Sequence, residues 1–131
     1  MRTWIFIDSA QAGAFRVGTL SHERVRVATV TARSHRILPE IAKRIGLSAI
    51  PSMEGICIVA GPGSFTAVRT GVLIANLLSR LFRKPLVSIM VEDASDLVRL
   101  SNQLATAHYP LSSYVAPVYS SEPNITLPKN P

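Results

Sequence analysis

One segment, residues 56–91, limits the choice of fold more than any other part of the chain. It opens with a continuous apolar run at 56–60, typical of a strand buried on both faces. A glycine turn follows at 61–63, and then an apolar stretch of helical length that ends near residue 82. After Pro85, residues 86–91 predict a second buried strand. Strands joined by a helical crossover run parallel, so this segment predicts a parallel pair with a helix packed on it.

The residues before this segment have a different pattern. Three strand candidates at 4–7, 14–20 and 25–31 follow one another closely and predict an antiparallel meander. Ser34 is expected to cap a helix that runs to about residue 45, where Gly46 ends it. With a further amphipathic helix at 94–107, the order is three strands, then alternating helix and strand. This order predicts an α/β fold with a mixed sheet, three meander strands, and helices on both faces.

The last residues change in character. Five prolines stand between residues 110 and 131, which favours an extended tail with one strand candidate at 114–119. We therefore expect one domain over residues 1–109 and a proline-rich tail over 110–131.

Composition excludes several classes of protein. Hydrophobic residues make up 47% of the chain, too many for a wholly disordered protein. Uncharged apolar runs of about 18 residues are absent, which argues against a membrane span, and the first residues reach an aspartate too early for a signal peptide. The single Cys57 excludes an internal disulfide, favours a reducing, cytoplasmic setting, and is expected to be an inert core residue.

The formal net charge of +6 allows a nucleic acid or another acidic partner. A basic surface with no such role is the alternative, because the basic residues are scattered along the sequence. Aromatic residues make up only 6%, which argues against a platform on which single-stranded RNA stacks.

The segment GPGSFTAVRTG, residues 61–71, has the residue types of a phosphate-binding loop. It lacks the lysine of a P-loop, and Thr66 stands where the dinucleotide fingerprint has its third glycine. We therefore expect a strand-to-helix turn, with Ser64 or Thr66 capping the helix, and no cofactor site. His22, His35 and His108 have no metal-binding spacing, and a catalytic Ser-His-Asp set cannot be assembled.

The helix behind this turn carries a ridge of small side chains, Ala67, Gly71, Ala75 and Ser79, spaced by four residues. Glycine inside a helix costs about 1 kcal/mol relative to alanine, so close approach of another backbone would explain it. Two interpretations stay open here. The ridge packs on the chain's own sheet, or one side of it meets a partner helix.

Several segments of the sequence, the glycine turn among them, resemble a known protein family. The segments IFIDSA, SHRILPEI, ICIVAGPGSFTAVRTGVLIANLL and KPLVSI are similar, in this order, to the N-terminal half of the bacterial TsaB/YeaZ proteins. The resemblance covers about residues 3–100 and implies an actin-like ATPase (ribonuclease H-like) fold. It also implies a non-catalytic subunit that helps make N6-threonylcarbamoyladenosine in tRNAs reading ANN codons. The implied partners are a TsaD-like transferase and a small TsaE-like P-loop ATPase, with tRNA reached through them.

The family pairs through helices of the N-terminal domain, which implies an interface on the helices at 35–45 and 64–82. The residues that the resemblance assigns to this interface are Ser64, Ala67, Val68, Arg69, Gly71, Val72, Ala75, Leu78, Ser79, His35 and Leu38. On this interpretation Gly71→Leu would abolish complex formation without unfolding the domain.

The sequence also departs from the family. Relatives usually have a second domain, and this chain leaves no room for one, so we expect most of it to be lost between about residues 101 and 114. Asp8 stands where active relatives place a phosphate loop, but Gln11 and Ala12 do not supply the glycines. Two alternatives therefore remain: a homodimer through the same helices, and a nucleotide-binding or peptidase-like enzyme.

Overall fold

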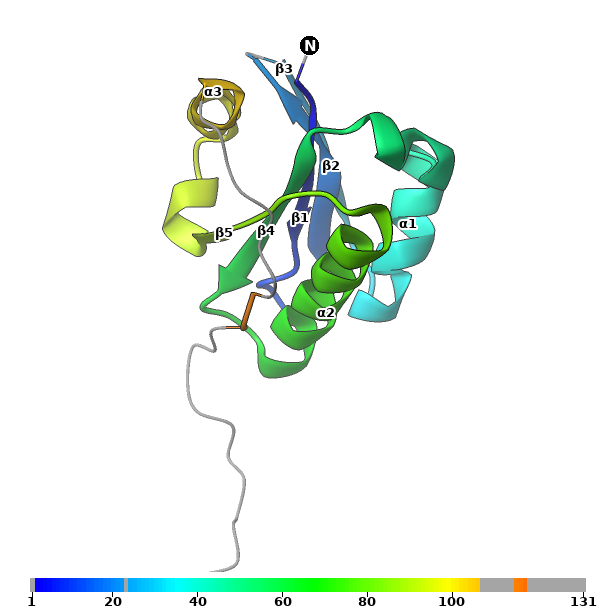
Figure 1. Ribbon diagram of the computed structural model, residues 1–131. Helices are drawn as coiled ribbons and strands as arrows, with labels where there is room; N and C mark the ends of the chain where they lie inside the picture. Colours follow the sequence, from blue (N-terminus) through cyan, green and yellow to red (C-terminus); the bar gives the residue numbers. More distant parts are fainter. Residues whose placement is uncertain (1, 23, 107–114, 118–131) are drawn as a thin grey trace, which may run out of the picture.

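The computed structural model describes residues 2–22, 24–106 and 115–117. They form a five-stranded mixed sheet in the order β3-β2-β1-β4-β5 (Figure 1). The strands are β1 (Trp4–Asp8), β2 (Phe15–Ser21), β3 (Arg24–Val30), β4 (Gly55–Gly61) and β5 (Leu86–Met90). The α-helices are α1 (Ile37–Arg44), α2 (Phe65–Phe82) and α3 (Leu97–Thr106). Short 3-10 turns precede α1 (η1, Ser34–Arg36), follow it (η2, Leu47–Ser52), and precede α3 (η3, Val91–Ala94).

The strand directions follow from the connections. Short connections without a helix join β1 to β2 and β2 to β3 in sequence, and both pairs are antiparallel. Helical crossovers connect β3 to β4 and β4 to β5, and the pairs β1·β4 and β4·β5 are parallel. Every residue of β4 is buried, as the continuous apolar run predicts for a central parallel strand.

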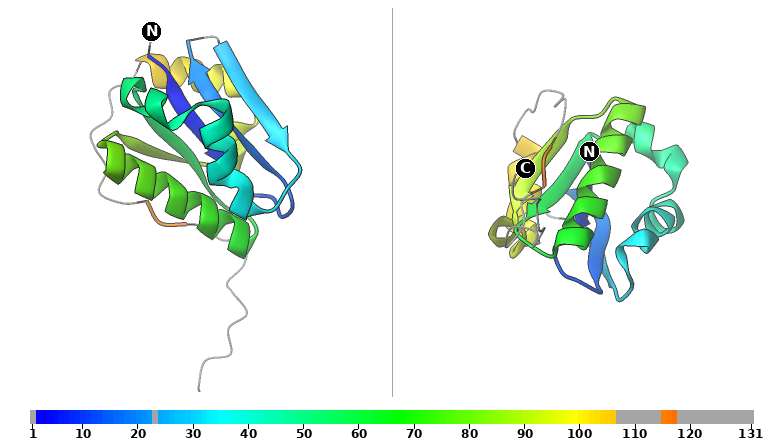
Figure 2. Two further views of the ribbon diagram at one scale, coloured as in Figure 1. Left: turned by 90° about the vertical axis from the view of Figure 1, so that its right-hand side faces the viewer. Right: turned by 90° about the horizontal axis from the view of Figure 1, so that it is seen from below.

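Helices cover both faces of the sheet. α1 and α2 lie side by side on one face, and α3 lies on the other (Figures 1 and 2). Each face has its own apolar core, because alternate residues of a strand point to opposite sides. Ile5, Ile7 and Ile58 pack towards α1 and α2, whereas Trp4, Phe6 and Cys57 pack towards α3. The predicted mixed sheet with helices on both faces is confirmed.

Three local predictions need correction. Ser34 does not cap α1: it begins η1, which leads into the helix, and neither helix start has a side-chain cap. Ser64 is the residue before α2, but its side chain makes no capping hydrogen bond either, and its main-chain oxygen accepts from the Val68 N–H (2.9 Å). The helix expected at 94–107 begins only at Leu97, because η3 precedes it.

The predicted end of α1 is correct. Gly46 has φ = 87°, a conformation that glycine adopts without strain, and the chain leaves the helix there. The expected domain boundary near residue 110 lies outside the described residues. The same holds for most of the strand candidate at 114–119, of which residues 115–117 are described and are not in a strand.

Candidate partner interface

The glycine turn that opens α2 is filled by the chain itself. Gly61 has φ = 124°, and a Cβ at Gly63 would lie 2.3 Å from the carbonyl oxygen of Ala10. The same carbonyl accepts a hydrogen bond from the Ser64 N–H (2.9 Å). The turn after β1 therefore sits directly against the glycine turn.

Asp8, at the end of β1, is held by neighbours in the same chain. Its Oδ2 accepts from Arg16 Nη2 (2.6 Å) and Nε (3.0 Å), and its Oδ1 accepts from the Ala10 N–H (3.0 Å). Arg16 also donates to the Ala94 carbonyl (3.1 Å) and stands over the Phe6 ring. Asp8 and Arg16 thus tie β1 and β2 to η3. This is the arrangement of a structural aspartate with satisfied hydrogen bonds.

The small-residue ridge of α2 faces the chain's own sheet. Gly71 marks the closest approach, because a Cβ there would lie 2.0 Å from Ser9 Oγ. That hydroxyl is buried and donates to the Ala67 carbonyl (2.7 Å), which fastens α2 to the turn after β1. At the other end of the helix, Ser79 Oγ donates to the Lys84 carbonyl (2.6 Å) and helps to close the helix.

Burial limits the access of a partner to most of the implied interface. Seven of the eleven residues are covered by their own domain: Ala67, Val68, Gly71, Val72, Ala75, Leu78 and Ser79. A partner helix therefore has no access to the ridge, and packing on the sheet explains its small side chains. Gly71→Leu is therefore expected to destabilise the domain itself, because a leucine at this position would clash with Ser9.

The outer face of α2 carries large apolar side chains instead. Leu73, Leu77 and Leu81 recur every fourth residue and are 65%, 53% and 67% exposed. We call these three side chains the leucine face. Sequence reasoning missed Leu73 and Leu77, although their spacing on the side away from the ridge was a readable signal.

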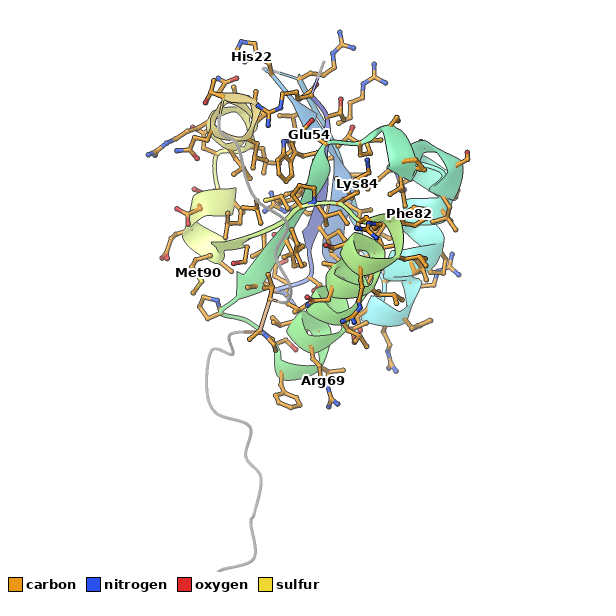
Figure 3. All side chains as sticks on the ribbon, in the orientation of Figure 1. His22, Glu54, Arg69, Phe82, Lys84 and Met90 are labelled. Atoms are coloured by element: carbon orange, nitrogen blue, oxygen red, sulfur yellow. The ribbon has the colours of Figure 1, made fainter. Side chains whose placement is uncertain are left out.

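The remaining four implied residues lie on α2, before it, or on η1 and α1, and they are not buried. Arg69 is exposed and His35, on η1, is exposed, while Ser64 and Leu38 are half-buried. η1 packs against α2, and Leu38 and Ile74 are partly buried apolar residues that pack against the core on this face of the sheet. Figure 3 shows Arg69 at one end of α2 and Phe82 at the other. The accessible surface of α1 and α2 is thus an apolar strip with basic residues beside it.

A third side of α2 binds a distant segment of the chain. Asn76 Nδ2 donates to the Val115 carbonyl (2.8 Å), and the Val115 N–H donates to Asn76 Oδ1 (2.9 Å). Val115 is buried in the core beneath α2. The asparagine amide thus pairs with one residue of extended backbone as a neighbouring strand would.

Two further groups of residues bear on function. Burial raises the pKa of the Cys57 thiol to about 12, so this cysteine is an unreactive core residue at neutral pH. In the described part of the chain, no three His, Cys, Asp or Glu side chains gather as metal ligands.

By length and composition alone, α2 would also pass for a membrane-crossing helix. Its inner face, however, packs on the sheet of the same domain. We interpret it as a core helix that is apolar on two sides.

Comparison with known proteins places the chain in a family. A family model described as "TsaD: tRNA N6-adenosine threonylcarbamoyltransferase" matches residues 28–115. Curated relatives with that name include one from Methylorubrum populi, 33% identical over 85 residues, which span 60% of this chain and 24% of the relative. Another, from Cryptococcus neoformans, is 30% identical over 91 residues, which span 66% of this chain and 24% of the relative.

Two solved structures share the fold. YeaZ from Pseudomonas aeruginosa superimposes with a TM-score of 0.61 at 22% identity, covering 69% of this chain and 43% of YeaZ. A protein described as similar to peptidase YeaZ, from the same organism, gives the same score and identity.

The chain belongs to the TsaD family, since the family model covers more than half of its residues. Its fold is that of YeaZ, so the fold implied by the resemblance to TsaB/YeaZ proteins is confirmed. The aligned part spans about a quarter of the length of the curated relatives.

Proposed function

We propose that this chain is a non-catalytic partner subunit in the modification of tRNA to N6-threonylcarbamoyladenosine. Its role would be to bind the transferase subunit, a relative of the same family. A small P-loop ATPase as a further component, and a cytoplasmic location, belong to the same proposal. The family membership supports the reaction class, and the leucine face is the observation that carries the binding role.

The leucine face suits a partner helix for physical reasons. Three exposed leucines at i, i+4 and i+8 form a straight apolar ridge, which packs into the groove of another helix. Burying the exposed part of each leucine, somewhat more than half of the side chain, contributes about 1 kcal/mol, so the three together stabilise a complex. Arg69 and His35 beside the ridge would add polar contacts at the rim.

A role without catalysis is supported by the state of Asp8 and of the glycine turn. Asp8 is paired with Arg16, and the Ala10 carbonyl fills the space beside Gly63. Both positions are therefore engaged in holding the fold. ATP turnover by the isolated chain, abolished by Asp8→Asn, would contradict this part of the proposal.

The binding role is tested by co-expression with a tagged transferase subunit from the same organism. Leu77→Glu should remove the chain from the purified complex, because it places a charge in the middle of the apolar ridge. Val98→Glu is the matched control: Val98 is 51% exposed on α3, on the other face of the sheet. Retention of the Leu77→Glu chain at the wild-type level would contradict the proposal.

A homodimer through the same face is the second candidate, because the leucine face is also complementary to a second copy of itself. Light scattering over a range of concentrations distinguishes the two. A stable dimer that persists when the transferase is added, with no mixed complex, would favour the homodimer.

A further inference from the structure

The fold gathers most of the net charge of the chain into one region. From the start of β3 to the residue after η2, residues 24–53, there are six arginines and lysines and one glutamate, so this segment carries +5 of the formal net charge of +6. The six are Arg24, Arg26, Arg33, Arg36, Lys43 and Arg44. On either side of the segment, Glu54 pairs with Arg2, and Glu23 lies outside the described residues.

The one acidic residue of this segment is already engaged. The Glu40 carboxylate is only 8% exposed and accepts from Arg44 Nε (2.8 Å) and Arg36 Nη2 (3.5 Å). The hydrogen bond from Arg44 holds the pKa of Glu40 below its usual range. Glu40 therefore stays charged at neutral pH and neutralises only part of the region.

A groove lies on the surface of this segment, and two of the six cations, Arg26 and Arg44, line it. Its volume is about 460 Å³, and its floor is the sheet surface of β2 and β3, with α1 and the residue after η2 as its wall. Val17, Thr19, Arg26 and Ala28 line the floor, and Arg44, Ile45 and Met53 line the wall. The described residues that line the groove include no acidic and no aromatic side chain.

Arginines of β3 face hydroxyl side chains of β2, one pair at the floor of the groove and the other next to it. In the β2–β3 register Arg26 stands opposite Thr19 and Arg24 opposite Ser21, so each arginine has a hydroxyl group beside it on the same face. The two arginines are two residues apart on one strand, about 7 Å, comparable with the distance between successive phosphates of an RNA strand. Within the described residues, Arg24, Arg26, Arg33 and Lys43 form no ion pair.

We propose that this groove binds the sugar–phosphate backbone of RNA, so that the chain itself contacts the tRNA on which the proposed complex acts. The proposal deepens the proposed function and rests on it for the identity of the RNA. Repeated arginine–hydroxyl pairs suit a chain of phosphates, and the lack of aromatic side chains fits backbone contact rather than base stacking. The arginines project from the face of the sheet and not along the free edge of β3, which argues against an acidic peptide added as a sixth strand.

The test is fluorescence anisotropy with an unmodified transcript of a tRNA that reads an ANN codon, at several salt concentrations. Arg26→Gln should weaken binding several-fold and lower the slope of log affinity against log salt concentration by about 1. The double variant Arg24→Gln/Arg26→Gln should lower both the affinity and the slope further. Arg99→Gln is the matched control, because Arg99 is exposed on α3, away from the groove, and should leave affinity and slope unchanged.

Three results would overturn the proposal. The first is equal loss of affinity in Arg26→Gln and Arg99→Gln. The second is failure of the chain to bind the transcript, both alone and with the transferase. The third is preference for poly-L-glutamate over the transcript at equal charge concentration.

Co-purification of the same variants with the transferase separates this proposal from the proposed function. The Arg26→Gln chain should still co-purify with the transferase but bind RNA more weakly. The Leu77→Glu chain should bind RNA with unchanged affinity but no longer co-purify with the transferase. If the Leu77→Glu chain still co-purifies with the transferase and Arg26→Gln still weakens RNA binding, the proposed partner interface is wrong and the proposed RNA-binding groove is supported.

Discussion

α2 has two apolar faces that are built from different residues. The inner face consists of Ala67, Gly71, Ala75 and their neighbours, which are small, and it is buried on the sheet. The outer face consists of Leu73, Leu77 and Leu81, which are large and are each more than half exposed. Small side chains bring two backbones close together, so they mark packing inside the fold. Large exposed side chains have apolar area left to bury, so they mark the surface on which a partner is expected.

The largest effect is expected when a bulky side chain is introduced on the inner face of α2. Gly71→Leu should lower the free energy of unfolding by about 3 kcal/mol or prevent folding, because the new side chain has no room beside Ser9. Urea denaturation measures the loss. If the variant is as stable as the wild type, the inner face is not closely packed and the comparison fails.

A double-mutant cycle keeps this test informative when the leucine variant does not fold. Gly71→Ala should destabilise the chain although alanine favours helices, and Ser9→Gly should recover part of that loss by removing the clashing atoms. Strictly additive losses would contradict the proposed contact.

The second prediction uses two adjacent leucines of α2. Leu78 is 3% exposed and Leu77 is 53% exposed, although both have the same side chain in the same helix. Leu78→Ala should lower the free energy of unfolding by about 2.5 kcal/mol, whereas Leu77→Ala should change it by no more than about 0.5 kcal/mol. Similar losses in the two variants would mean that the helix is rotated relative to the structure.

The third prediction concerns the polar side of α2, where Asn76 lies. Asn76→Ala removes both hydrogen bonds to the Val115 backbone and should cost about 1.5 kcal/mol. Hydrogen exchange at the Val115 amide should become faster, while the amides of β4 remain protected. Unchanged exchange at Val115 would show that the segment is held by other contacts.

The sequence was sufficient to predict the order of the elements and the mixed sheet. The apolar runs at 56–60 and 86–91, with a glycine turn and a helix between them, leave little choice but a parallel pair. The meander was readable because three short strands follow one another with short connections. The missing cap at Ser34 was not readable, because a 3-10 turn there replaces the start of the helix.

The orientation of α2 could not be predicted, because the helix is apolar on two sides. Ser9, far away in the sequence, helps to fix which side meets the sheet, through its closeness to Gly71 and its hydrogen bond to Ala67. The groove in the basic region could not be predicted for a similar reason. Its cations come from β3 and α1, and the fold places Arg26 and Arg44 on the two sides of one groove.

Thiol labelling gives the most direct test that the leucine face contacts the transferase. Cys57 is buried with a raised pKa, so a cysteine introduced on the surface is the reactive thiol of the chain. With Leu77→Cys, adding the transferase subunit should slow labelling at least tenfold, while Val98→Cys on α3 should label at its original rate. Equal labelling of Leu77→Cys with and without the transferase, under conditions where the complex forms, would contradict the account.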